Sequence, residues 1–194
     1  MTSPLFRVAV VAGLSSLLMG LSAGAMTRPR GPQSALATFG ERTAAYAAVH
    51  RQVERRLPAL EAAQTFHSLY RTRVMFARAI KAARPNGREG DIFTPAVGDA
   101  FRTIIARALS GIDSEAFLRN LYEDQETAPG FRPRVYDSYP EWATHEVPIV
   151  LLERLPLLPE ELEYRLLDHD LILWDVDANL IIDVLPDAIP GPTS

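Results

Sequence analysis

The chain of 194 residues contains no cysteine. This absence excludes a disulfide framework, a thiolate metal site and a lipid-modified cysteine behind a signal peptide. Asn-x-Ser/Thr acceptor sites for N-glycosylation are lacking too. With 47% hydrophobic and 23% charged residues, the composition is that of an ordinary globular protein. Such a chain has to fold by burying its own apolar side chains.

A membrane-spanning run is also missing. The apolar run from Val8 to Leu21 is shorter than the roughly 20 residues that cross a bilayer, which disfavours an uncleaved anchor. It follows the positive Arg7 and precedes Ser22-Ala23-Gly24-Ala25, which has the A-x-A form of a signal-peptidase site. We therefore expect a signal peptide over residues 1–25, cleavage after Ala25, and a periplasmic or secreted product without a stable membrane anchor.

Lysine is scarce, and the basic residues are unevenly distributed. Residues 26–113 carry 14 basic side chains (Lys81 and 13 arginines) against 7 acidic ones, a balance of +7. Residues 114–194 carry 5 arginines against 17 acidic residues, a balance of -12. Either the two halves neutralise each other within one fold, or a basic helical face binds an anionic partner such as a cell-wall polymer or lipid headgroups. Nucleic acid is not expected as a partner, because aromatic residues are not interleaved with the arginines.

The familiar catalytic and nucleotide-binding motifs are absent as well. The sequence contains neither G-x-S-x-G nor S-x-x-K, and neither of the phosphate-binding loops GxxxxGK[ST] and GxGxxG. No residue is therefore assigned as catalytic, cofactor-binding or metal-binding, and no cofactor is expected.

Apolar residues recur at helical spacing over residues 37–124, behind a Pro/Gly-punctuated linker at 26–36. The spacing predicts a first helix that ends at Pro58, a second over about 60–83, a third that starts at Thr94-Pro95, and a fourth capped by Asp113 or Ser114. The expected buried stripes are Phe39, Thr43, Tyr46, His50, Val53 and Leu57 in the first helix, Phe66, Leu69, Phe76 and Ile80 in the second, and Val97, Phe101, Ile104, Ile105 and Ala108 in the third. Short connections between four amphipathic helices predict a small four-helix bundle.

The remaining chain divides into two parts. Six prolines and several aromatic residues over 125–159 predict an ordered, extended strap packed on the bundle, with one or two helical turns in 147–155. In 160–194, the runs LEYRLL, LILWDV and LIIDVL are rich in strand formers and are separated by the turn sequences DHD and DAN. They predict a C-terminal three-stranded antiparallel meander, in which Leu180, Ile182 and Val184 share one face and Asp183 lies on the other. The expected fold class is α+β.

His50 and Glu54 are the strongest candidates for chemistry. They stand at i and i+4 on the first predicted helix, a spacing that suits an acid/base pair or two metal ligands. However, HExxH is absent, and His67 and His145 are isolated. His50 also lies on the apolar stripe, so the favoured interpretation is a partly buried structural histidine, with Glu54 as its candidate partner. An enzyme of unrecognised type, such as a hydrolase that uses His50 and Glu54, is the alternative.

The stretch DVDAN places Asp175, Asp177 and Asn179 like the first three ligands of an EF-hand loop. The loop's sixth and twelfth positions require Gly and Glu, but here they are Leu180 and Pro186. We therefore interpret DVDAN as a β-turn. The acidic turn Asp168-His169-Asp170 is predicted to lie at the other end of the intervening strand, roughly 20 Å away, so the two turns cannot share an ion.

The export signal, the GDIFTP segment and the ending LEYRLLDHDLILWDVDANLIIDVLPDAIP together resemble a family of uncharacterised exported bacterial proteins. That resemblance implies no activity and supplies no functional residues. The ending is also similar to the closing hairpin of small periplasmic metal-homeostasis proteins, although no His-rich or acidic ligand motif accompanies it. We therefore expect a non-catalytic binding or scaffolding module for an envelope component, with arginines of the second helix as the contact surface.

Overall fold

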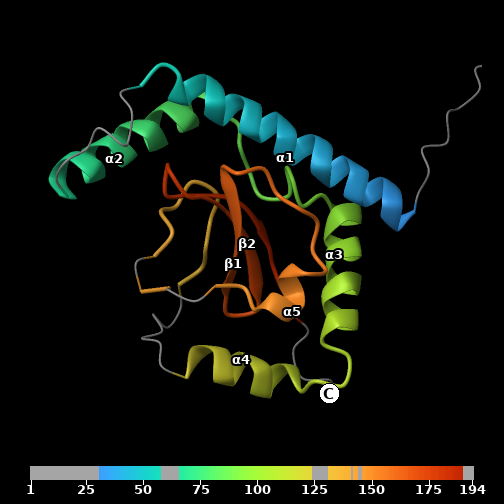
Figure 1. Cartoon of the computed structure of the whole chain (residues 1–194). Coiled ribbons are helices and arrows are strands. Elements are labelled where there is room, and N and C mark those ends of the chain that lie inside the picture. Colours follow the sequence, from blue (N-terminus) through green and yellow to red (C-terminus); the bar gives the residue numbers. More distant parts are fainter. Residues whose placement is uncertain (1–30, 58–65, 124–130, 141, 144–145, 190–194) are drawn as a thin grey trace, which may run out of the picture.

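The computed structural model describes residues 31–57, 66–123, 131–140, 142–143 and 146–189. Its helices are α1 (Pro32–Glu54), α2 (Phe66–Ala83), α3 (Pro95–Ala108), α4 (Ser114–Tyr122) and α5 (Ile149–Leu152), and its strands are β1 (Leu162–Leu167), β2 (Asp170–Asp175) and β3 (Leu180–Leu185) (Figure 1). The predicted α+β class is confirmed.

The C-terminal strands form one antiparallel sheet in the order β1-β2-β3, as the meander prediction requires. Both turns contain a residue with positive φ, Asp168 at 56° and Asn179 at 48°. Asp and Asn tolerate this conformation better than other residues with a Cβ atom, which explains why DHD and DAN stand at the two reversals.

A β-bulge changes the alternation of side chains along β3. Leu173 pairs with Asp183, but the next residue of β2, Trp174, pairs with Ile181, so Ile182 is the extra residue. Leu180, Ile182 and Leu185 consequently join the core shared with the helices, whereas Ile181 and Val184 pack on the opposite face. The prediction that Val184 shares a face with Leu180 and Ile182 is wrong, because the alternation assumed an unbroken ladder.

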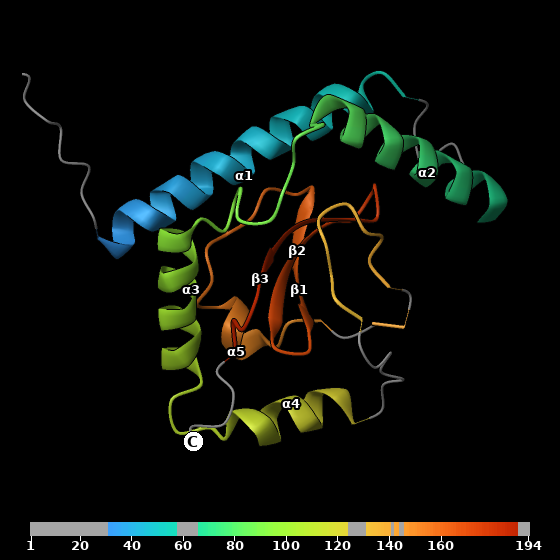
Figure 2. The ribbon, with the colours of Figure 1, turned by 180° about the vertical axis from the view of Figure 1, so that it is seen from behind.

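The helices surround the sheet. In both views α1 and α2 form an angled cover over one end of the sheet, α3 runs along its side, and α4 lies at the end opposite α1 (Figures 1 and 2). The main core fills the space between α1, α3 and the sheet, where the Phe39 ring lies 4.7 Å from that of Phe101. A four-helix bundle is not confirmed, since the described helices number five and the three strands contribute much of the core.

The predicted helix limits and stripes agree with the structure in part. Buried residues of α1 include Phe39, Thr43, Tyr46, His50 and Val53, all from the predicted stripe. Helix α1 begins at Pro32, inside the expected linker, because proline suits the first turn of a helix. The predicted start of the second helix near residue 60 and its end signal at Pro58 lie outside the described residues.

Two helix starts follow from their capping residues. The carboxylate of Asp113 accepts hydrogen bonds from the amides of Glu115 and Ala116, which confirms the predicted cap of α4. Thr94 occupies the N-cap of α3 and Pro95 the first turn, although the Thr94 side chain makes no capping hydrogen bond.

The proline-rich strap lies on the face of the sheet away from α1 and α3. Tyr139 and Ala143 pack there with Ile172, Ile181 and Val184. Further along, α5 is a single helical turn, and Leu151 and Leu155 join the main core. None of the helices within the described ranges combines the length and hydrophobicity needed to cross a membrane.

Candidate functional site

A buried polar cluster joins α1 to the turn that contains DVDAN. The Asp175 carboxylate at the end of β2 lies 2.7 Å from His50 Nδ1 and accepts a hydrogen bond from the Tyr46 hydroxyl at 2.5 Å. Its other oxygen accepts from the Ala178 amide at 2.8 Å. His50 is 1% exposed and Asp175 is 0% exposed. Asp175 thus links α1 to the sheet, and both of its carboxylate oxygens are engaged in hydrogen bonds.

Asp177 lies on the other side of the same imidazole. Its carboxylate is 3.5 Å from His50 Nε2, and its side chain is 47% exposed. Burial by itself lowers the pKa of His50, but the hydrogen bonds with Asp175 and Asp177 outweigh burial and raise the pKa to about 9. The contact with His50 in turn lowers the pKa of Asp177. His50 is therefore an imidazolium at neutral pH, with each N–H directed at a carboxylate.

This protonation state limits the chemistry available to His50. A general base needs a free ring nitrogen and a pKa near the working pH, and neither condition holds in this cluster. Burial and the hydrogen bond to Asp175 raise the pKa of Tyr46, so its hydroxyl stays protonated. Among the described residues, no three or more His, Asp or Glu side chains are arranged so that they could hold a metal ion. The geometry of the cluster is that of a structural ion pair.

The predicted partner of His50 is incorrect. Glu54 is exposed, and the two ring nitrogens of His50 face Asp175 and Asp177. Asp175 and Asp177, more than a hundred positions away in the sequence, take the place of Glu54 as partners of His50. His50 is more deeply buried than the predicted partial burial, since it is only 1% exposed. His145 lies outside the described residues, as does the side chain of His67.

DVDAN forms the turn between β2 and β3, as predicted. The side chain of Asn179 accepts a hydrogen bond from Trp174 Nε1 at 3.0 Å, so its carbonyl oxygen is engaged within the protein. At the other end of β2, the His169 ring contacts the Ile189 carbonyl at 3.1 Å and lies 3.7 Å from Glu115. The two acidic turns stand at opposite ends of β2, as expected, and each makes its own contacts.

A second buried carboxylate was not identified from the sequence. Asp183 is 0% exposed and accepts hydrogen bonds from the amides of Gly90 at 2.8 Å, Ile92 at 2.6 Å and Phe93 at 2.7 Å. Burial raises its pKa, and these amides oppose the rise. The GDIFTP segment thus wraps around an aspartate of the third strand. The one signal in the sequence was an acidic residue in the middle of LIIDVL, an otherwise apolar strand.

A small cleft with two arginines lies between α1 and the segment after α2. It has a volume of about 310 Å³ and is lined by Arg42, Ala45, Tyr46, Val49, Arg84, Asp91 and Ile92. Arg84 forms an ion pair of 2.8 Å with the Asp91 carboxylate, and Arg42 donates to the Asp91 carbonyl. Two guanidinium groups against one carboxylate leave the cleft positively charged.

The cleft adjoins the basic helix α2. Lys81 and Arg84 both lie over the ring of Tyr136, at 6.0 and 5.8 Å from its centre. Helix α2 contains four basic residues and no acidic one. Arg71, Arg78 and Lys81, which we call the basic face, are exposed, whereas Phe76 and Ile80 on the other side of the helix are buried. Of the predicted arginines of the second helix, Arg71 and Arg78 are therefore at the surface, whereas Arg73 is half-buried.

Similarity to other proteins does not add to this geometry. The GDIFTP loop and the third strand contact each other through Asp183. That contact accounts for the fold of the two segments and specifies no activity. Comparison of the chain with protein-family models gives no match, and comparisons with curated proteins and with solved structures give none either.

Proposed function

We propose that this protein is an exported, non-catalytic binding module that holds an anionic component of the bacterial envelope against the basic face of α2. The proposal rests mainly on one observation: the positive charge of α2 is left largely unneutralised by the acidic half of the chain. A surface of one sign attracts a partner of the other sign and raises its local concentration.

The ion pairs support this proposal. Between residues 26–113 and the acidic half, the described residues form ion pairs only where Arg51 meets Glu161 and where His50 meets Asp175 and Asp177. Within the same described ranges, no carboxylate pairs with Arg71, Arg78 or Lys81. Mutual neutralisation of the two halves is therefore incomplete, which favours a basic face that serves a partner.

The position of α2 also supports the proposal. Its N-terminal end projects past the sheet in both views (Figures 1 and 2). Tyr70 and Met75 on this helix are 60% and 40% exposed. Basic side chains beside an exposed aromatic ring suit the interface of an anionic bilayer, where the ring enters the headgroup layer and the cations contact phosphates.

The arginine cleft at the C-terminal end of α2 would seat one anionic group of the partner. Arg42 and Arg84 can each present a planar pair of N–H donors to a carboxylate or phosphate. An incoming anion would compete with Asp91 for Arg84, which makes the cleft selective for strongly charged groups.

Binding of the mature chain to vesicles tests the proposal. Vesicles that contain phosphatidylglycerol should retain the protein at low ionic strength and release it at about 0.5 M salt, where the Debye length falls to a few Å. Neutral phosphatidylcholine vesicles should not retain it. An acidic polysaccharide immobilised on beads provides a second arm, which distinguishes a polymer partner from a lipid one.

Charge-matched variants identify the surface. The triple change Arg71→Glu, Arg78→Glu and Lys81→Glu should abolish binding to both probes. The control is Arg119→Glu, Arg132→Glu and Arg134→Glu, which alters net charge equally at exposed arginines of the acidic half. The proposal fails if both triple variants lose the same affinity, because net charge alone would then explain retention, or if the native protein binds neither probe.

Export needs its own test. N-terminal sequencing of the native product should begin at Met26 in a periplasmic or culture fraction. A product that begins at Met1 in the cytosolic fraction would contradict the proposed compartment and, with it, an envelope partner.

A further inference from the structure

Exposed apolar residues gather around α5. Within the described residues, four of the seven large hydrophobic side chains at the surface come from one short stretch: Ile149 (69% exposed), Val150 (37%), Leu152 (38%) and Leu157 (96%). We call these four residues the α5 ridge. Large apolar side chains that gather at the surface are typical of an interaction site.

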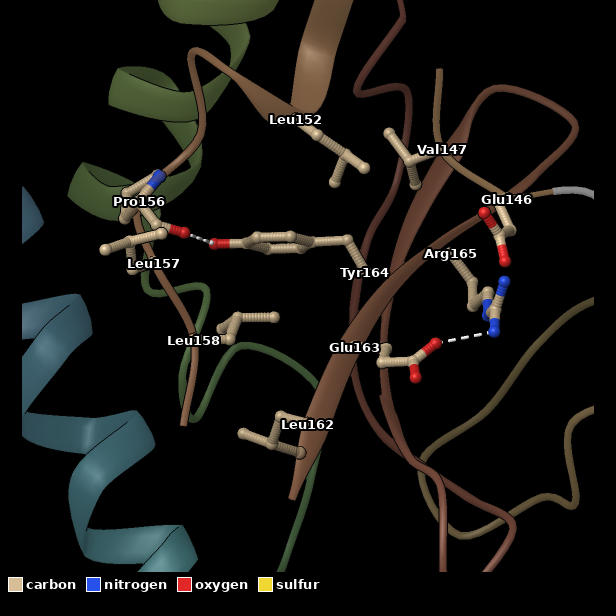
Figure 3. Close-up of a pocket in the computed structure, with 10 residues that line it drawn as sticks. All are labelled: Glu146, Val147, Leu152, Pro156, Leu157, Leu158, Leu162, Glu163, Tyr164 and Arg165. Atoms are coloured by element: carbon tan, nitrogen blue, oxygen red, sulfur yellow. Dashed lines mark hydrogen bonds and ion pairs between the residues drawn. The ribbon is translucent and has the colours of Figure 1, made fainter. Parts of the chain in front are cut away.

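A cleft lies on each side of the ridge. The first, of about 410 Å³, separates α5 from β1, and Leu152 and Leu157 form part of its wall. Figure 3 shows the Tyr164 ring reaching across this cleft to the Pro156 carbonyl, to which its hydroxyl donates at 3.0 Å. The second cleft, also of about 410 Å³, separates α5 from α3 and is lined by Ile104, Arg107, Ala108, Val150 and Arg154. The ridge is thus flanked by hollows that can accept apolar side chains.

The two clefts carry opposite charge. The first contains Glu146 and Glu163 against a single Arg165, which is held by Glu163 at 2.5 Å (Figure 3). The second contains Arg107 and Arg154 and no acidic residue. Both of these arginines are exposed, and neither is ion-paired within the part of the chain that the structure describes.

We propose that the α5 ridge is the two-fold interface between two copies of this chain. A two-fold axis through the ridge places the basic cleft of one copy against the acidic cleft of the other, and repeats the contact on the far side. The same rotation sets the ridge of one copy against the ridge of the other, so that the exposed apolar side chains of both copies are buried together. Isologous dimers of this type are the commonest protein assemblies. A partner of uniform charge would match only one side of the ridge, whereas a second copy matches both.

Sedimentation velocity of the mature chain tests this interface. Over about 1 to 100 µM, the range in which interfaces of modest size become populated, the protein should shift from monomer to dimer. The change Leu157→Asp should give a monomer throughout, and Ile149→Asp should do the same. Both residues are exposed, so these variants should keep the circular dichroism spectrum of the native protein.

Matched controls locate the contact. Met75→Asp introduces the same charge at an exposed apolar position of α2 and should leave the dimer intact. Arg154→Glu should weaken the dimer at least tenfold, and Glu146→Arg added to it should restore affinity because the pairing is reversed across the axis. A native protein that stays monomeric up to 100 µM overturns the proposal. So does a dimer that Leu157→Asp leaves unchanged or that Met75→Asp disrupts.

Discussion

His50 and Asp175 meet at 2.7 Å although 125 positions separate them, and neither side chain has appreciable contact with solvent. The pair is surrounded by further polar contacts, since Tyr46 donates to the same carboxylate and Asp177 approaches the other ring nitrogen. An ion pair so placed ties α1 to the end of β2. Its removal should therefore lower the free energy of unfolding of the whole fold.

We predict that Asp175→Ala lowers the free energy of unfolding by about 3–5 kcal/mol, because it leaves a buried imidazolium and the Tyr46 hydroxyl without their acceptor. Urea unfolding followed by circular dichroism measures the change. Glu54→Ala is the control, since this exposed neighbour should cost no more than about 0.5 kcal/mol. A larger loss from Glu54→Ala than from Asp175→Ala would restore the i,i+4 pairing that the structure rejects.

The protonation of His50 predicts a loss of stability at alkaline pH. Its pKa is about 9 in the folded protein against 6.5 for the ordinary side chain, so the folded state binds the proton more tightly. The resulting stabilisation is complete below pH 6.5 and disappears as the pH rises through 9. It amounts to roughly 3 kcal/mol at 1.36 kcal/mol per pKa unit.

Histidine NMR and urea unfolding at several pH values check this prediction. The ring protons of His50, assigned by their loss in His50→Gln, should titrate near pH 9. Asp177→Asn removes one of the hydrogen bonds that raise the pKa, and should move the titration to lower pH and flatten the alkaline decline in stability. Titration near the ordinary histidine value in the native protein would contradict the assigned imidazolium.

Asp183 should be nearly irreplaceable. Asp183→Asn substitutes a donor for one of the oxygens that accept from the Gly90, Ile92 and Phe93 amides, so at least one buried N–H loses its partner. The expected cost is about 1–3 kcal/mol for Asn and more for Ala. Asp99→Asn, on a carboxylate that is 82% exposed, should be close to neutral. Hydrogen exchange adds a local readout, because amide protection at Ile92 and Phe93 should fall in Asp183→Asn.

The local elements could be predicted because their signals are local. Periodic apolar residues marked α1 and α3, Asp113 marked the start of α4, and DHD and DAN marked the turns between strands that begin at Leu162 and end at Leu185. Each of these assignments depends on residues within a few positions of one another. Propensity, capping and turn chemistry act over that range.

The buried polar contacts could not be predicted, because the neighbours of each residue in the sequence already accounted for its presence. Asp175 suited a turn and His50 had Glu54 four residues away, so nothing in the sequence pointed from one to the other. The β-bulge at Ile182 could not be predicted from the sequence either. Without it Asp183 would face the strap, and with it the carboxylate turns toward the Gly90–Phe93 amides. Alternation along a strand predicts faces only while the ladder is unbroken.

Two glycines provide a last, matched prediction. A Cβ at Gly87 would overlap the Tyr136 hydroxyl and lie 2.6 Å from Tyr136 Cζ. Tyr136 cannot easily retreat, because its hydroxyl donates to the Arg84 carbonyl and its amide donates to the Ile181 carbonyl at 2.8 Å. Gly87→Ala should therefore destabilise the protein by about 1–3 kcal/mol, as overpacking does.

At Gly40, by contrast, a Cβ would meet nothing within 4 Å, and the residue lies inside α1. Gly40→Ala should stabilise the protein by about 0.5–1 kcal/mol, because alanine loses less backbone entropy in a helix. Urea unfolding of the two variants under identical conditions should thus give changes of opposite sign. If Gly87→Ala proved as stabilising as Gly40→Ala, Tyr136 would not be held against the end of α2, and the path by which the strap reaches Arg84 would need revision.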